Sequence, residues 1–328
     1  MRSFFSRVIR FAGIHDVLRK EKKSAVTVLC FHRVNDEKNI VWPSTGTAMF
    51  RNIMLYCKRY YSVILPEDWQ QKTINPKLII TFDDGFGDFM HYALPILSQY
   101  NFPAVHNVVI DSVLNSRPNW TYRLNMILEN HVDSNAPFSL KKFNIDYCKL
   151  VTLKNVSAMS LEAVQLLKDF TPSEIGAVIE GLENPYKERM VFPEMMDRSN
   201  LLECESAGIR IGSHGWSHLL VDGPFSDSIL HHEIVDSRNE LQKLLNHPVP
   251  YFAFPAAHYN ERAVNFTAAA GYPYLFAAGD IFFYQNTMQE FPIIFPRIVT
   301  PTSGADEAIL KMEGFHSSIK KWRNTLNG

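Results

Sequence analysis

Residues 78–85 read LIITFDDG, an uncharged run that leads directly into two aspartates and a glycine. A continuous apolar run of this kind is typical of a strand buried on both faces. A helical stretch follows from about Phe89 to Tyr100, and FPAVHNVVI (102–110) then predicts a second strand. This strand–helix–strand unit predicts a parallel sheet with right-handed crossovers.

The same alternation continues on both sides of this unit. Further strand patterns are AVTVLCF (25–31), GIRIG (208–212), YFAFP (251–255), YLFAA (274–278) and IIFPRIVT (293–300). Apolar residues at helical spacing predict helices over about 226–246 and 260–270. The chain is therefore predicted to have an α/β fold.

The alternation stops between Asp111 and Ser206, where the pattern is mostly helical. One helix start is marked by the capping box TPSE (171–174), with proline at the first helical position. Long insertions between strands of such a sheet usually cover or shape a site. We therefore predict that this insertion forms one wall of a cleft.

Composition narrows the class of protein. The 328 residues are 46% hydrophobic and 20% charged, as in ordinary globular proteins. The net charge of −1 gives no basic excess for binding nucleic acid. Four widely spaced cysteines predict neither a disulfide framework nor a zinc ribbon, and they fit a reducing compartment.

The first 23 residues are the basic end of the chain, with seven Lys or Arg against two acids. Because Arg7 and Arg10 interrupt the apolar stretch, we expect no secretory signal and a cytoplasmic location. The apolar residues recur at helical spacing, so this segment is either a helix lying peripherally on the inner membrane face or a helix packed on the body. The longest uncharged run, 263–279, is too short and polar for a transmembrane helix. The expected organisation is this helix, a body over 24–310 with the insertion at about 111–206, and a tail over 311–328.

Two motifs carry the candidate chemistry. Asp83 and Asp84 directly follow LIITF, and His214 and His218 in SHGWSH (213–218) directly follow GIRIG. Each motif alone also fits a structural role, as a turn or helix cap for the aspartates and as surface residues for the histidines. Both motifs leave the carboxyl ends of predicted parallel strands, where α/β barrels gather their active sites. One carboxylate with two imidazoles leaves metal positions for water and substrate, and the other carboxylate is then available to accept a proton.

TFDDG (81–85) with SHGWSH resembles the polysaccharide deacetylase family, also called the NodB homology domain or carbohydrate esterase family 4. The resemblance extends from about Val26 to Val299, and it includes CFHRV (30–34), PAVHNVV (103–109) and FAFP (252–255). It implies a distorted (β/α) barrel with fewer than eight full repeats.

The resemblance also implies roles for individual residues. Asp83 would be the general base, and Asp84, His214 and His218 would hold a divalent metal ion, usually zinc, with Co²⁺, Ni²⁺ or Mn²⁺ as alternatives. The N–H of Ala256, after Pro255, would bind the oxyanion. Tyr259 follows the same motif as expected, and Trp216 lies between the two histidines, where it would contact substrate or pack structurally.

The sequence departs from the family pattern at three points. One of them is that Ala256 and Ala257 replace the tyrosine and glycine that commonly follow the proline of FAFP (252–255). FAFP (252–255) corresponds to the third motif of the family. Many members carry an arginine there that orients the catalytic aspartate, and Ala253 takes its position in this sequence. Arg297 matches a Pro-Arg-Ile strand of one subgroup, so it either lines the site or forms a structural salt bridge. The late Leu-x-His motif that supplies the general acid is missing, which leaves His32 and His258 as candidate proton donors.

The first function hypothesis is removal of N-acetyl groups from an amino sugar in a polysaccharide or in a lipid- or nucleotide-linked glycan precursor. The second hypothesis has the same fold but a different bond that is hydrolysed, which makes the protein an O-acetyl esterase or a non-sugar amide hydrolase. The third is a catalytically silent glycan-binding module, suggested by the missing late histidine.

Overall fold

The computed structural model describes residues 14–22, 25–134, 136–279, 281–284 and 291–315. Its centre is a barrel of parallel strands: β1 (Ala25–Phe31), β3 (Lys77–Asp84), β4 (Ala104–Val108), β7 (Ile209–Ser213), β8 (Tyr251–Ala253), β9 (Tyr274–Ala278) and β11 (Ile293–Val299). Each pairs with the next in the order β1-β3-β4-β7-β8-β9-β11, and β11 returns to β1 at Leu29↔Ile298 and Cys30↔Val299. These seven strands confirm the expected barrel with fewer than eight repeats.

Two short strands extend the sheet at the amino ends of the barrel strands. β2 (Ser62–Val63) lies parallel to the start of β3, and β10 (Phe283–Tyr284) lies antiparallel to the start of β1. At their amino ends, β1 pairs with β10 and not with β11, and β3 pairs with β2 and not with β4. The barrel therefore closes fully only toward its carboxyl end.

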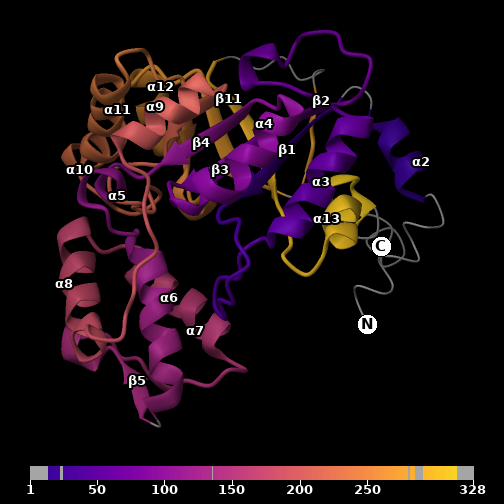
Figure 1. Cartoon of the computed structure of the whole chain (residues 1–328). Helices are drawn as coiled ribbons and strands as arrows, with labels where there is room; N and C mark the ends of the chain where they lie inside the picture. Colours follow the sequence, from indigo (N-terminus) through magenta and orange to yellow (C-terminus); the bar gives the residue numbers. More distant parts are fainter. Residues whose placement is uncertain (1–13, 23–24, 135, 280, 285–290, 316–328) are drawn as a thin grey trace, which may run out of the picture.

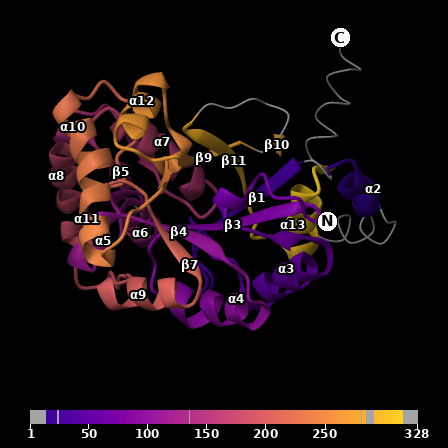
Figure 2. The same ribbon diagram turned by 90° about the horizontal axis from the view of Figure 1, so that it is seen from above.

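Helices cover the outside of the barrel (Figures 1 and 2). They are α3 (Thr47–Tyr60), the π segment η2 (Phe89–Ala93) with α4 (Leu94–Tyr100), α9 (Arg198–Ser206), α10 (Asp227–His231), the π segment η6 (His232–Asp236), α11 (Ser237–Leu245), α12 (Glu261–Ala269) and α13 (Ala305–Met312). Short 3₁₀ turns lie at η1 (Pro66–Asp68) and η7 (Pro255–Ala257). The predicted helices at 89–100, 226–246 and 260–270 are therefore present, the first two with a π segment inside.

The insertion forms a helical lobe that projects from the barrel (Figure 1). Its elements are α5 (Ile110–Asn115), α6 (Trp120–His131), η3 (Val132–Ser134), β5 (Pro137–Ser139), η4 (Lys141–Phe143), β6 (Cys148–Leu150), α7 (Val156–Leu167), α8 (Pro172–Glu183) and η5 (Asn184–Tyr186). The predicted capping box is present at Thr171 and Glu174. The small hairpin of β5 and β6 was not predicted.

Strand periodicity assigns the two faces of the barrel strands, because successive side chains point to opposite sides. Val26, Val28, Ile79, Val105 and Phe295 belong to the cluster inside the barrel. Alternate residues such as Leu29, Ile80 and Phe82 belong to the larger cluster under the helices. All eight residues of β3 are buried, including Lys77, Asp83 and Asp84 at its two ends.

The ends of the described chain pack against each other. α2 (Ile14–Glu21) leads to Lys22, whose ammonium is buried and lies 3.0 Å from the Glu313 carboxylate beyond α13. Arg19 donates to the Tyr56 hydroxyl on α3 at 2.7 Å. The described part of the basic end is thus packed on the body, whereas residues 1–13, 23–24 and 316–328 lie outside the described residues. The tail was expected from residue 311, but α13 continues to Met312. Within the described residues, no helix is long and apolar enough to cross a bilayer.

Candidate active site

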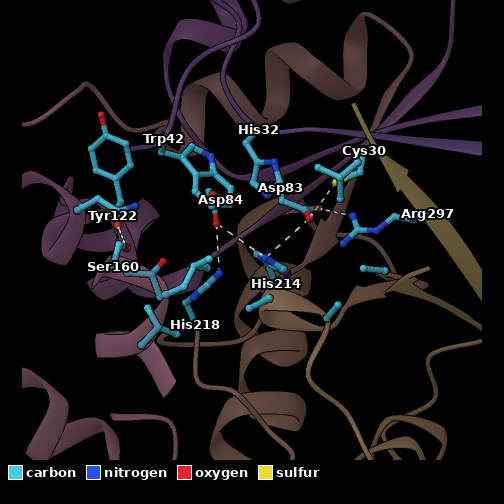
Figure 3. A pocket seen from close by; sticks show the side chains of 18 residues that line it. Cys30, His32, Trp42, Asp83, Asp84, Tyr122, Ser160, His214, His218 and Arg297 are labelled. Carbon is cyan, nitrogen blue, oxygen red and sulfur yellow. Dashed lines mark hydrogen bonds and ion pairs between the residues drawn. The ribbon is translucent and has the colours of Figure 1, made fainter. Parts of the chain in front are cut away.

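Asp84, His214 and His218 meet at the carboxyl end of the barrel (Figure 3). The Nε2 atoms of His214 and His218 lie 3.8 and 3.5 Å from the same oxygen, Oδ1 of Asp84. The three side chains are buried, and their ligand atoms lie within 4.8 Å of one another. This carboxylate–imidazole–imidazole set is a common ligand set for a catalytic zinc ion.

The hydrogen bonds of these side chains fit a metal ion. His214 Nδ1 lies 2.8 Å from the Ala253 carbonyl oxygen, so this nitrogen carries the proton and Nε2 presents its lone pair to the site. Asn119 Nδ2 donates to Asp84 Oδ1 at 2.8 Å and so orients the carboxylate. The indole of Trp120 donates to the His218 carbonyl at 2.9 Å and fixes the backbone there.

The backbone at this point is in a conformation that L-residues rarely adopt. Asp84 has φ 78° and His218 has φ 63°, both in the left-handed region. Gly85 continues the same turn with φ 83°. Strain at non-glycine residues costs of order 1–3 kcal/mol each and is concentrated at functional sites. Here the turn brings Asp84 to the cavity lined by Asp83, although neighbouring strand residues normally face opposite sides.

Asp83 has different partners from Asp84. Its Oδ1 accepts hydrogen bonds from Arg297 Nη1 at 2.7 Å and from Asn107 Nδ2 at 2.8 Å. Burial alone would raise the pKa of Asp83, but the charge of Arg297 and the hydrogen bond that it donates hold this pKa well below its usual range. Asp83 is therefore ionised at neutral pH.

The other ionisable groups are shifted mainly by burial. Burial, and then the charge of Asp83, raise the pKa of Asp84 to about 8. A bound divalent cation has the opposite effect on such a group. Burial lowers the pKa of His32 to about 4, and it also lowers the pKa of His214 and His218. The histidines are therefore neutral, which is the form that binds a metal ion.

Arg297 contacts Asp83 from a different strand than the one that carries Ala253. It enters from β11, is 4% exposed and contacts Asp83, while Ala253 on β8 lies among the apolar residues inside the barrel. Of the two roles that the sequence left open, Arg297 combines both: it lines the cavity and forms a buried ion pair.

Replacing Arg297 with methionine is expected to move the acidic limb of the pH–activity profile to higher pH. Without the guanidinium, burial dominates and the pKa of Asp83 rises, so the base is protonated at a higher pH. Breaking this buried pair also costs about 3–5 kcal/mol of stability. Because the folded pKa of Asp83 is depressed, this stabilisation is present above the unfolded pKa and is lost as the pH falls through the folded pKa.

The measurements for Arg297→Met are kcat/KM against pH and urea unfolding at several pH values. Arg297→Lys keeps a positive charge and should move the profile back toward that of the parent. An Arg297→Met variant with an unchanged acidic limb would show that Arg297 does not set the protonation of the base.

The turn after β8 places two alanines at the cavity. Ala256 and Ala257 have φ 47° and 63° and line the cavity. The N–H of Ala257 donates to the Phe254 carbonyl at 3.0 Å, whereas within the described residues the N–H of Ala256 has no acceptor. An N–H without an acceptor beside the cavity is what the predicted oxyanion role of Ala256 needs.

Several predicted contact residues lie outside this cavity. Pro255 is buried in the turn, and Tyr259 stacks on Phe254 with ring centroids 4.8 Å apart. Trp216 packs against His232, with ring centroids 4.3 Å apart, and does not line the cavity. Of the two candidate proton donors, His32 lines the cavity, whereas His258 pairs with Asp222 at 2.9 Å and does not line it.

The residues that support the site but were missed from the sequence include Asn107, Asn119 and Glu233. Asn107 lies opposite Asp83 in the β3–β4 register, and a Cβ on Gly212 would collide with its side chain. Glu233 is fully buried and accepts hydrogen bonds from the Trp216 and Ser217 N–H groups at 3.0 and 2.9 Å, so it holds the loop between the two histidines. A signal for Glu233 was present, because it is a carboxylate at a core position of a predicted helix.

The cavity itself has a volume of about 250 Å³. The barrel contributes its polar floor, and the insertion contributes Thr121, Tyr122, Asn125, Ser160, Leu161 and Val164. The insertion therefore lines one side of the cavity, as predicted. Trp120 is buried at 6% exposure, so it offers no surface for stacking a sugar.

These features define a parallel barrel with a candidate hydrolytic metal site at its carboxyl end. The family profile described as polysaccharide deacetylase matches residues 157–275, a range that includes His214 and His218 but not Asp83 and Asp84. The match confirms the resemblance to the polysaccharide deacetylase family that the motifs indicated. No curated protein matches the sequence.

Solved structures of deacetylases have a fold similar to that of this chain. The deacetylase PplD of Streptococcus pyogenes, in complex with acetate, has a TM-score of 0.58 and 14% identity, over 88% of this chain and 98% of that chain. IcaB from Ammonifex degensii has a TM-score of 0.57 and 12% identity, over 88% and 97%. A polysaccharide deacetylase from Bacillus cereus has a TM-score of 0.57 and 15% identity, over 88% and 69%. At these identities the likeness shows the fold, and the family supports an enzyme acting on acetylated glycans.

Proposed function

We propose that this chain is a metal-dependent hydrolase that removes N-acetyl groups from an amino sugar of a glycan or glycan precursor. One observation carries the proposal: Asp84, His214 and His218 converge in a cavity where the neighbouring Asp83 is ionised. A metal-ligand set beside an ionised carboxylate is the combination that hydrolysis by activated water requires.

Each residue around the cavity has a separate role in the proposed hydrolysis. Asp84, His214 and His218 would hold a zinc ion, which when bound polarises a carbonyl and lowers the pKa of water. Asp83 accepts the proton of the attacking water, and Arg297 and Asn107 keep its carboxylate ionised and oriented. The N–H of Ala256 stabilises the developing oxyanion.

His32 is proposed as the group that returns a proton to the leaving amine. It lines the cavity and lies edge-on to Trp42 at 5.3 Å, on the same strand end as Cys30. Because burial keeps its ring neutral, it would donate only after taking up the proton held by Asp83. In this order, the proton passes from the water to the Asp83 carboxylate, then to the His32 imidazole, and finally to the leaving amine.

The lining of the cavity bears on the substrate. Among its described lining residues, Arg297 is the only lysine or arginine, and its guanidinium is held by Asp83. Trp42, Leu161 and Val164 form an apolar wall above the floor. A diphosphate would find no basic partner among these residues, so the lining favours a neutral sugar over a diphosphate group inside the cavity.

The cellular setting stays a prediction. A cytoplasmic location and contact with the inner membrane face rest on the basic character of residues 1–23.

The test is acetate release from N-acetylglucosamine oligomers, measured beside the zinc content of the protein. We expect acetate from these N-acetylated substrates with one equivalent of zinc, and loss of release after chelation. A matched panel of O-acetylated sugars is the control. Release from O-acetylated sugars alone would make the chain an esterase, and glycan binding by zinc-loaded protein without any acetate release would make it a binding module.

A further inference from the structure

A second group of metal-ligand side chains lies in the same cavity, separate from Asp84, His214 and His218. It consists of Cys30, His32 and Asp83, whose ligand atoms lie within 4.8 Å of one another (Figure 3). Cys30 Sγ is 3.5 Å from Asp83 Oδ2. All three residues line the cavity, so an ion in solution can reach them.

The barrel topology explains why these three side chains meet. Cys30 lies at an inward position of β1, and His32 follows two residues later at the end of that strand. β1 and β3 are parallel and in register at Cys30↔Thr81 and Phe31↔Phe82, so Asp83 comes level with His32. The sulfur, the imidazole and the carboxylate therefore belong to two adjacent strand ends and not to a mobile loop.

Each of the three side chains has ligand capacity left. Asp83 uses Oδ1 to bind Arg297 and Asn107, which leaves Oδ2 facing the sulfur. The His32 ring forms no hydrogen bond within the described residues, and it is partly exposed. The Cys30 thiol has weak contacts to Asp83 and to the Phe31 carbonyl at 3.8 Å. The catalytic proposal gives Cys30 no role.

The chemistry of this set selects soft or borderline metal ions. A thiolate, an imidazole and a carboxylate bind Zn²⁺ or Co²⁺, whereas Mg²⁺ and Ca²⁺ prefer oxygen ligands alone. Burial raises the pKa of the Cys30 thiol, and Arg297 lies beside the same carboxylate. A metal ion must therefore displace the thiol proton next to a fixed positive charge, which makes this the weaker of the two sites.

We propose that Cys30, His32 and Asp83 form a second, inhibitory zinc site that fills when zinc is in excess. Binding forms a zinc–sulfur bond and releases the thiol proton to solvent, without any change in oxidation state. The inhibition rests on the proposed function, because Asp83 Oδ2 cannot act as the base while it is bound to the ion. The ion binding itself does not depend on that function.

The test uses Co²⁺ as a spectroscopic probe of thiolate ligation. The set Asp84, His214 and His218 contains no sulfur, so the first equivalent of Co²⁺ should give no thiolate-to-cobalt charge-transfer band. Further Co²⁺ should produce that near-ultraviolet band. Cys148 is the exposed cysteine, and all variants therefore carry Cys148→Ser to remove adventitious binding.

Cys30→Ser should abolish the band while the first equivalent of metal still binds. Cys204→Ser is the matched control, because Cys204 is also fully buried but lies beside Met90 and outside the cavity. Circular dichroism checks folding, and Cys30→Ala replaces Cys30→Ser if the serine variant does not fold. In equilibrium dialysis with excess zinc, the parent should retain two equivalents and Cys30→Ser one.

Activity gives a separate readout. Excess zinc should inhibit acetate release by the parent, and Cys30→Ser should raise the inhibitory zinc concentration at least tenfold. A charge-transfer band that never forms, or that survives in Cys30→Ser and disappears in Cys204→Ser, would overturn the second site. A Cys30-dependent band in a protein that releases no acetate would support the site and refute the proposed function, so the two failures are distinguishable.

Discussion

Asp83→Asn is expected to lose about 10²–10⁴-fold in kcat while the zinc content stays near that of the parent. Asparagine has nearly the same shape as aspartate, and its carbonyl oxygen can still accept from Arg297 or Asn107. It cannot accept the proton of the attacking water, because the amide is a very weak base. The measurement pairs acetate release under saturating substrate with zinc determined on the same sample.

The control for this variant addresses stability. Removing the charge of Asp83 leaves the buried Arg297 guanidinium unpaired, which costs about 3–5 kcal/mol when one partner of a buried pair is lost. Asp83→Asn combined with Arg297→Gln removes both charges, and it should regain stability without regaining turnover. If the double variant recovers activity with stability, then Asp83 is a structural partner of Arg297 and not the base.

The geometry distinguishes the two adjacent aspartates. Asp84 presents one oxygen to both histidine Nε2 atoms, at 3.8 and 3.5 Å, and this is the arrangement of a ligand. Of the two ligand histidines, Asp83 approaches only His214, at 3.9 Å, and its other oxygen is held by Arg297. The assignment of Asp83 as base and Asp84 as ligand stays a prediction that the two variants test in opposite ways.

Much of the barrel was predictable because burial on both faces leaves a clear sequence pattern. Once the interior cluster is known, strand period places Cys30, Asp83 and Arg297 on inward positions, because each lies at an even spacing from an apolar interior residue of its own strand. The order of strands around the barrel was not predictable in this way. The sequence showed that position 253 is an alanine, but the contact between Arg297 and Asp83 became visible only once β11 was seen to close onto β1.

The contacts from the insertion were harder to predict for a different reason. Asn119 lies just before α6, and its contact with Asp84 depends on how the lobe folds back over the barrel. Hydrophobic periodicity does not predict how the insertion packs on the barrel. The helix predicted over 226–246 was correct in extent, but the π segment at His232–Asp236 was not foreseen, and this segment includes Glu233. Such segments depend on tertiary packing and are frequent at functional sites.

Asp84→Ala and His218→Ala should lose metal and activity together, by about 10³-fold or more in rate. A catalytic metal ion supplies several kcal/mol of transition-state stabilisation, and each 1.36 kcal/mol corresponds to a factor of ten. With one of three ligands removed, the two remaining side chains cannot retain the ion against dialysis. Zinc content and acetate release, measured together after dialysis, check this result.

A graded series makes the same prediction sharper. Asn119→Ala leaves all three ligands in place but frees the Asp84 carboxylate, so it should weaken metal affinity about 10–100-fold, as is usual for residues that orient a ligand. His258→Ala is the matched control, since this histidine pairs with Asp222 outside the cavity and should leave zinc unchanged. The expected order of zinc affinity is therefore parent and His258→Ala first, then Asn119→Ala, with Asp84→Ala and His218→Ala last. Full zinc occupancy in Asp84→Ala, with loss of zinc in Asp83→Asn, would reverse the roles of the two aspartates.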